Sequence, residues 1–257
     1  MFYFRKMNLL RILLFPFAIL YGFITGIRNF LFDKGILKSY SFDVPVIAVG
    51  NLSVGGTGKT PQIEYLIRLL SPKYKVATLS RGYKRLTFGF RMVALSDSFK
   101  EVGDEPAWLK RKYPHLNIGV AENRVEGIPN LVGHALHTDC ILLDDGFQQQ
   151  GIRIDLNILL TPYHSPYTKD QFLPVGRLRE GKSEAKRADI IIVTKCPENL
   201  LQKKSQVLQE LNIQIENHQT AFLSSIYYAT PFLLNYEGIQ LSLKEVDTVL
   251  LLTGIAD

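Results

Sequence analysis

The sequence predicts an α/β fold built on a mostly parallel sheet with helices on both faces. Short apolar runs alternate with helical stretches through the middle of the chain. The apolar runs are continuous and do not alternate with polar residues, which is typical of parallel strands that are buried on both sides. A glycine-rich loop follows the first run and precedes a helical stretch, which is the order of a strand, a phosphate-binding turn and a helix.

The N-terminus carries an apolar run that lies outside this alternation. Residues 12–27 contain no charged side chain, and basic residues flank them at Arg5, Lys6, Arg11 and Arg28. A signal peptide is disfavoured because no small-residue cleavage site follows the run. A spanning helix needs about 20 apolar residues, and this run is slightly short and contains Pro16. We favour a helix lying in the membrane interface, with its basic flanks on anionic headgroups. The alternative is an apolar helix packed on the domain.

Strands and helices are expected in a regular order after this segment. In the first helix, Ile63, Leu66, Ile67 and Leu70 share one face, as a buried stripe requires. The expected strands are Val44–Gly50, Lys75–Ser80, Arg91–Leu95, Asn117–Ala121, Cys140–Asp144, Leu156–Leu160 and Ile190–Thr194. The expected helices are Lys59–Leu70, Glu105–Tyr113, Asn123–Leu136 and Glu198–Leu211.

Three parts follow from this pattern. Residues 1–40 form the membrane-associated helical segment, and residues 41–218 form the core domain. Residues 219–257 are expected to hold a linker strand within Phe222–Leu234 and, at Val246–Thr253, the start of a second α/β domain that is cut short.

The composition indicates an anionic partner without identifying it. The chain has 257 residues, 46% hydrophobic and 21% charged, with a formal net charge of +6. That charge suits a nucleic acid, an anionic membrane or a phosphorylated substrate, and does not choose among them. Each of the two cysteines, Cys140 and Cys196, sits at one end of an apolar run, so we expect buried, reduced thiols. With only two cysteines, the sequence has neither a disulfide framework nor the spacing of a zinc site.

The loop from Ser53 to Thr60 is the sharpest signal. It matches the P-loop consensus except that Ser53 replaces the first glycine, so the fold is expected to be P-loop NTPase-like. Lys59 is expected to reach the β- and γ-phosphates of ATP, and the Thr60 hydroxyl to bind Mg²⁺. The full set of expected ATP-binding residues is Ser53, Val54, Gly55, Gly56, Thr57, Gly58, Lys59 and Thr60.

Two pairs of acidic residues are candidates for metal and proton chemistry. Asp144 and Asp145 follow a buried strand, where a carboxylate commonly holds Mg²⁺ beside a phosphate loop. Asp104 and Glu105 begin a helix. They could serve only as helix caps, with Asp104 at the N-cap, or could accept a proton from an attacking hydroxyl and contact a metal.

Basic side chains gather near these motifs. Arg81 lies directly after a strand, where ligands bind in open α/β sheets. Arg124, Arg177 and Arg179 are further candidates for gripping phosphate, because a guanidinium can donate two parallel hydrogen bonds. Gln148 could supply a polar contact or simply belong to a turn.

Taken together, these motifs closely resemble the tetraacyldisaccharide 4′-kinase family of lipid A biosynthesis. The resemblance covers essentially the whole chain and includes the serine in the phosphate loop. Its motifs are the N-terminal apolar helix, Val49–Pro61, Ser80–Tyr83, Gly103–Pro106, Ala121–Arg124, Leu143–Gln148, Leu173–Pro174 with Arg179–Glu180, and Gly254–Ala256.

The resemblance implies transfer of the γ-phosphate of ATP, with Mg²⁺, to the 4′-hydroxyl of a lipid A disaccharide 1-phosphate. Asp104 would be the general base, assisted by Lys59 and Glu105. Thr60, Glu105, Asp144 and Asp145 would be metal-associated. The substrate would meet Arg81, Tyr83, Arg124, Gln148 and Arg179. The family implies a monotopic enzyme on the cytoplasmic face of the bacterial inner membrane, with the anionic membrane surface as a partner and no nucleic-acid or protein partner.

The resemblance also implies a second domain with an Asp-His-His segment beyond residue 257. We therefore expect this chain alone to bind ATP–Mg²⁺ weakly and to turn over poorly. The alternative function is a regulatory or metallochaperone-type GTPase. The sequence Thr194–Pro197 stands where a guanine-reading Asn-Lys-x-Asp would be needed, which argues against that alternative.

Overall fold

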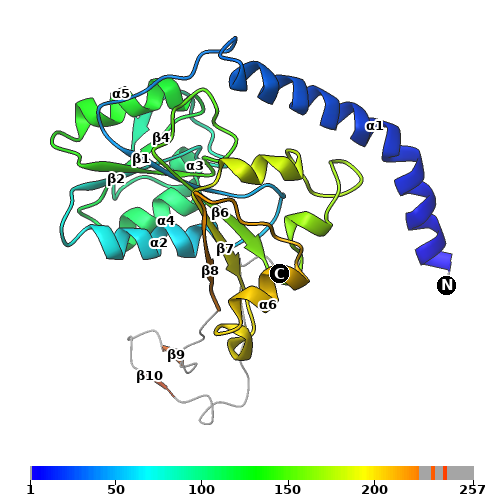
Figure 1. The fold of residues 1–257 in the computed structure, drawn as a ribbon. Coiled ribbons are helices and arrows are strands. Elements are labelled where there is room, and N and C mark those ends of the chain that lie inside the picture. Colours follow the sequence, from blue (N-terminus) through cyan, green and yellow to red (C-terminus); the bar gives the residue numbers. More distant parts are fainter. Residues whose placement is uncertain (1, 226–232, 235–239, 242–257) are drawn as a thin grey trace.

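The computed structural model describes residues 2–225, 233–234 and 240–241 (Figure 1). The strand expected at Val246–Thr253 and the motif at Gly254–Ala256 lie outside the described residues.

One eight-stranded sheet forms the centre of the molecule, in the order β3-β4-β2-β5-β1-β6-β7-β8. Neighbouring strands are parallel, except that β3 runs antiparallel to β4. The mostly parallel α/β fold predicted from the apolar runs is therefore confirmed. The strands are β1 Val46–Gly50, β2 Val76–Ser80, β3 Arg91–Met92, β4 Asn117–Val120, β5 Cys140–Asp144, β6 Leu156–Pro162, β7 Ile190–Thr194 and β8 Thr220–Leu223; the short strands β9 Leu233–Leu234 and β10 Gln240–Leu241 pair separately.

Helices cover both faces of this sheet. Figure 1 shows α5 on one side of the strands and α2 with α4 on the other. The helices that follow α1 are α2 Lys59–Leu70, α3 Phe99–Val102, α4 Asp104–Lys112, α5 Arg124–His134 and α6 Lys204–Glu210, with short 3-10 helices η1 Tyr167–Lys169, η2 Lys182–Arg187 and η3 Glu198–Leu200. The helix predicted at Glu198–Leu211 is thus divided into η3 and α6.

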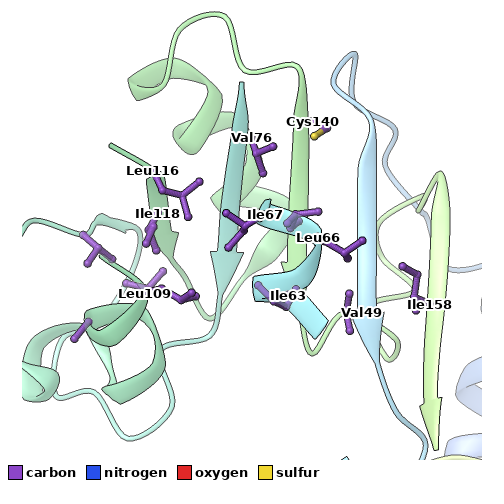
Figure 2. Packing of buried hydrophobic residues seen from close by; sticks show 14 of the residues in the cluster. Val49, Ile63, Leu66, Ile67, Val76, Leu109, Leu116, Ile118, Cys140 and Ile158 are labelled. Atoms are coloured by element: carbon purple, nitrogen blue, oxygen red, sulfur yellow. The ribbon is translucent and has the colours of Figure 1, made fainter. Parts of the chain in front are cut away.

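The core beneath α2 explains why the helix after the loop is so firmly placed. Ile63, Leu66 and Ile67 are buried and point toward the strands (Figure 2). They pack with Val49 of β1 and with buried side chains of neighbouring strands. Truncating such a residue to alanine costs about 2–5 kcal/mol. The start of α2, where the loop ends, is therefore fixed against the sheet.

The position of β1 determines where a ligand can bind. β1 lies between β5 and β6, and pairs in parallel with both. From β1 the chain continues to β2 on one side, whereas from β5 it continues to β6 on the other. In open α/β sheets ligands bind at such a switch point, outside the carboxyl ends of the strands. The glycine-rich loop follows β1 at this edge, and Asp144 is the last residue of β5.

The apolar N-terminal segment is a long helix, α1 Phe2–Asp33, that extends beyond the predicted run in both directions. Its stretch Arg11–Asp33 is long and apolar enough to cross a membrane by length and composition alone. Within Arg11–Asp33 most of the large apolar side chains are exposed, whereas Ala18 and Asn29 are buried. One side of the helix is therefore small and polar, and the rest is apolar and exposed. The apolar run in the sequence did not indicate this difference between the two sides. The exposed large side chains are Ile12, Leu13, Phe15, Phe17, Ile19, Leu20, Phe23, Ile24, Ile27 and Phe30.

The strand β8, near the C-terminal end of the core domain, is part of the main sheet. β8 pairs in parallel with β7, so Thr220–Leu223 belongs to the main sheet. The predicted linker, which begins at residue 219, therefore starts with a strand of the main sheet. The expected second domain beyond this strand remains a prediction.

Candidate active site

The glycine-rich loop connects β1 to α2 in a conformation that only its glycines adopt easily. Gly55 has φ 128° and Gly58 has φ 91°, and L side chains rarely occupy this region. Gly58 stands at the N-cap of α2 and offers no side chain to cap it. Pro61 lies in the first turn, where it lacks an N–H that a helix would leave unpaired in any case. The backbone N–H groups and the helix dipole at this end form an anion site.

Neighbouring elements hold the loop in place. Asn51 Nδ2 donates a hydrogen bond to Thr57 Oγ1 at 2.8 Å. Thr194, at the end of β7, donates from Oγ1 to the carbonyl of Thr57 at 2.8 Å. The backbone N–H of Val54 donates to the carbonyl of Arg177 at 2.8 Å. The loop is thus tied to its own strand, to β7 and to the segment that carries Arg179.

Asp145 lies beside the loop lysine and is held by two cations. Its carboxylate accepts two hydrogen bonds from the Arg179 guanidinium, each at 2.8 Å. Lys59 Nζ lies 3.6 Å from Asp145 Oδ1. Burial tends to raise the pKa of Asp145, but the hydrogen bonds and charge of Arg179, with the charges of Lys59 and Arg124, outweigh it and lower the pKa to about 2. Asp145 is therefore a permanent anion at neutral pH.

Asp144 has the opposite character. Its Oδ1 is buried and has no hydrogen-bond partner among the described residues. Burial, together with the negative charges of Glu105 and Asp145, raises its pKa to about 7. A buried carboxylate oxygen without a partner is costly. A divalent cation would satisfy it, and would favour the charged form.

The surroundings of Asp144 fit Mg²⁺. The Thr60 hydroxyl hydrogen-bonds Glu105, which places a hydroxyl and a second carboxylate at the same point. Within the described part of the chain, no three His, Cys, Asp or Glu side chains gather into a metal-holding group. Mg²⁺ commonly binds through one or two carboxylates and completes its shell with waters and substrate phosphates. This oxygen donor set is of that kind.

A second group of predicted residues forms a rim at the start of α4. Asp104 is the first residue of the helix and is exposed, and Gly103 stands at the N-cap. The N-cap position expected for Asp104 is therefore wrong, because Gly103 occupies it and Asp104 is already in the first turn. The Asp104 carboxylate accepts a hydrogen bond from the N–H of Glu105 at 3.0 Å. A Cβ at Gly103 would lie 3.0 Å from the backbone of Gly82 and 3.2 Å from the nitrogen of Tyr83. Glycine at 103 thus lets the loop after β2 approach Asp104.

Arg81 and Tyr83 are carried on that loop. Arg81 is exposed, and Tyr83 is 68% exposed. The Lys84 ammonium lies 5.4 Å from the centre of the Tyr83 ring. Side chains placed in this way are accessible to a ligand that reaches Asp104.

Arg124 is buried and does not lie on the surface of the site. It is 2% exposed, and its Nη1 donates to the carbonyl of Ala121 at 3.0 Å. Burial lowers its pKa to about 10, against the raising effect of Asp144 and Asp145. Its positive charge favours the ionised forms of Asp144 and Asp145. A substrate contact by Arg124 remains a prediction.

Arg179 and Gln148, also predicted as substrate contacts, are engaged with the loop. Both donate to the backbone carbonyl of Asn51, Gln148 from Nε2 at 2.7 Å and Arg179 from Nη2 at 3.1 Å. Arg179 also donates to the Asn51 side-chain oxygen. Asn51 is a residue of this site that was not among the predicted ones. A polar residue between a buried strand and a glycine-rich loop was the available signal.

Comparisons with known proteins point to one family. A family model described as tetraacyldisaccharide-1-P 4′-kinase matches residues 10–257. A tetraacyldisaccharide 4′-kinase of Flavobacterium johnsoniae is 52% identical over 97% of this chain and 73% of its own length. One of Porphyromonas gingivalis is 43% identical over 94% of this chain and 68% of its own length. The crystal structure of LpxK from Aquifex aeolicus in complex with ATP matches with a TM-score of 0.67 and 34% identity, covering 86% of this chain and 85% of that one.

Proposed function

This chain belongs to the tetraacyldisaccharide-1-P 4′-kinase family, and on that premise we propose that it transfers the γ-phosphate of ATP to the 4′-hydroxyl of a tetraacyldisaccharide 1-phosphate. The observation that carries the proposal is the meeting of three features at one edge of the sheet. These are the phosphate loop, the aspartate pair after β5, and the Asp104–Glu105 pair at the start of α4. The contact between Thr60 and Glu105 joins the first to the third.

The loop residues bind and orient the triphosphate in this proposal. The N–H groups from Gly55 to Thr60 surround the phosphate oxygens, and the Lys59 ammonium neutralises charge that develops on the transferred group. Thr60, Glu105 and Asp144 would hold Mg²⁺, which would offset the negative charge of the triphosphate during transfer. Asp145 acts beside them by pairing with Lys59 and with Arg179.

Asp104 receives the proton of the acceptor hydroxyl. Its exposure at the start of α4, next to the Glu105 that contacts Thr60 of the loop, suits a base that meets the second substrate beside the nucleotide. General bases of this kind contribute about 10²–10⁴-fold to rate. Arg81 and Tyr83 line the approach to Asp104. The guanidinium groups of Arg124 and Arg179 and the amide of Gln148 complete the polar surroundings on the side of the aspartates.

The membrane provides the setting for a substrate with acyl chains. The exposed apolar side of α1 inserts into the cytoplasmic face of the bacterial inner membrane, with its basic flanks on anionic headgroups. Flotation of the protein with anionic vesicles, and weaker flotation with neutral ones, would support this placement. Equal recovery in the absence of vesicles would contradict it.

The reaction is tested by the position of the new phosphate. The protein is incubated with ATP, Mg²⁺ and the tetraacyldisaccharide 1-phosphate in detergent micelles, and the product is analysed by ³¹P NMR and mass spectrometry. The expected product, which this chain alone should form slowly, carries a second phosphomonoester on the 4′-oxygen, and Lys59→Ala should lower its rate of formation by at least about 10²-fold. A diphosphate at position 1, or release of inorganic phosphate alone, would contradict the proposal.

A further inference from the structure

The side of α1 that faces the body differs in chemistry from the rest of the helix. Ala18 and Asn29 are buried there, and Tyr21 and Gly22 lie between them. A Cβ at Gly22 would lie 2.8 Å from the ring of Phe172, so glycine permits close contact. The remainder of the helix exposes large apolar side chains. A helix that only attached the protein to a membrane would need none of these specific contacts.

One set of contacts reaches the segment that carries Arg179. The Tyr21 hydroxyl donates to the backbone carbonyl of Arg179 at 3.1 Å. The Tyr21 ring meets the Phe172 ring edge to face, with centroids 6.4 Å apart. Arg28 Nη1 lies 3.9 Å from the carboxylate of Glu180, which is only 2% exposed. The segment from Phe172 to Glu180 is therefore held from the side of α1.

A second set of contacts reaches the turn after the aspartate pair. Arg28 Nη2 donates to the carbonyl of Gln148 at 3.3 Å. The side-chain oxygen of Asn29, which is 3% exposed, accepts from Gln150 Nε2 at 2.7 Å. Gln150 Nε2 also lies 3.4 Å from Glu180 Oε1. Asn29 and Arg28 thus connect both segments to the same turn of the helix.

Each of these segments directly holds a part of the phosphate site. Arg179 clamps Asp145 and donates to Asn51, and its N–H donates to the carbonyl of Leu52 at 2.8 Å. Gln148 donates to the carbonyl of Asn51. Tyr21 therefore connects to Asp145 through Arg179 alone. Arg28 connects to Asn51 through Gln148 alone.

We propose that Tyr21, Arg28 and Asn29 are positioning residues for phosphoryl transfer, because they fix the segments that carry Arg179 and Gln148 and so set the arrangement of Asp145 and the phosphate loop. The inference rests on the proposed kinase activity. It assigns the helix a role in catalysis that is separate from attachment to the membrane. Reacting groups must be held closely for transfer, and a displacement of about 1 Å can cost about 10²-fold in rate.

The test compares three variants with a matched control in detergent micelles, where the lipid substrate is dispersed and attachment to a bilayer is not required. Asn29→Leu removes the acceptor for Gln150, Arg28→Gln removes the contacts to Gln148 and Glu180, and Tyr21→Phe removes only one hydroxyl. Lys34→Gln is the control, because it removes a positive charge from the exposed end of the same segment without reaching the site. The measurements are kcat, KM for ATP, melting temperature and flotation with anionic vesicles.

We expect Asn29→Leu to lower kcat about 10- to 100-fold, Arg28→Gln about 10-fold, and Tyr21→Phe a few-fold. Flotation should stay within the range set by Lys34→Gln, and KM for ATP should change less than kcat. If Asn29→Leu does not fold, Tyr21→Phe and Arg28→Gln still decide the matter. A kcat within twofold of wild type in the folded variants, or an equal loss in Lys34→Gln, overturns the inference. Absence of 4′-phosphate formation by the wild type would instead overturn the proposed function.

Discussion

The two halves of the candidate active site are built in different ways. At the phosphate loop, Asp145, Arg179 and Asn51 are joined by short hydrogen bonds and lie in partly buried surroundings. At the rim, Asp104 and Tyr83 are exposed and make few contacts with the body. The nucleotide side is therefore arranged before any ligand binds, whereas the acceptor side is open to a large amphiphile. Substitutions should separate these two halves, because one set of residues acts on the triphosphate and the other on the acceptor.

The largest effect is expected at the loop. Lys59→Ala should reduce kcat by at least about 10²–10³-fold, since it removes a charge aimed at the transferred phosphate. The fold should persist, because Lys59 lies at the edge of the site and Arg179 still pairs with Asp145. Steady-state kinetics with the lipid substrate measures the first, and circular dichroism the second. Turnover at the wild-type rate in the folded variant would remove the loop from the mechanism.

Asp104→Asn should cause a loss of about 10²–10⁴-fold in kcat, because an amide cannot accept the hydroxyl proton. Glu101→Gln is a suitable control, since Glu101 is an acid of the neighbouring helix α3 that caps its own helix. The control should keep kcat near wild type. Equal losses in the two variants would indicate that negative charge near α4 matters in general, and not a base at position 104.

Asp144 provides a prediction about pH. Its pKa is raised from 3.8 to about 7 in the folded protein, so between these values the folded state binds more protons than the unfolded state. Its contribution to the free energy of unfolding must then decrease as pH rises through this window. Asp144→Asn removes the decrease, so the variant should gain melting temperature over wild type between about pH 5 and pH 8 in the absence of Mg²⁺.

Mg²⁺ with ATP should reverse this order, because the cation binds the ionised carboxylate and stabilises wild type alone. Thermal unfolding with and without ATP–Mg²⁺ at both pH values measures both effects. A variant that follows wild type at every pH would contradict the assignment of Asp144.

The smallest effect is expected at the exposed rim. Tyr83→Ala should raise KM for the lipid by about 10-fold or less and leave KM for ATP unchanged, which corresponds to about 1.4 kcal/mol of binding. Tyr65→Ala, at a similarly exposed tyrosine on α2, is the control and should change neither. An altered KM for ATP in Tyr83→Ala would show that the two halves are not separate.

Residues in continuous apolar runs were predicted closely. Cys140–Asp144, Ile190–Thr194 and Lys59–Leu70 have the expected bounds. The two strands are buried on both faces, and the helix begins directly after the glycine-rich loop. Arg91–Leu95 gives only a two-residue strand, because this edge strand pairs on one side alone. α1 is longer than the charge-free run of residues 12–27 but lies within the predicted helical segment of residues 1–40, because charged residues at its ends interrupt the apolar run without interrupting the helix.

The sequence allowed most residues of the site to be named, but not the contacts among them. The loop and the acidic pairs could be named because their chemistry is tied to short motifs. Nothing local to Arg124 indicates that it is 2% exposed, since its burial depends on packing against β5 and the loop after β4. The link from Asn29 to Gln150 spans a sequence separation of 121 residues, and depends on how α1 docks on the body.

The claim that nucleotide binding and acceptor activation lie in separate halves is tested most directly by calorimetric titration of ATP–Mg²⁺ into Lys59→Ala and Asp104→Asn under identical conditions. The account predicts that Asp104→Asn binds ATP–Mg²⁺ within about twofold of wild type, whereas Lys59→Ala binds about 10-fold or more weakly. Equal weakening in both variants would contradict it.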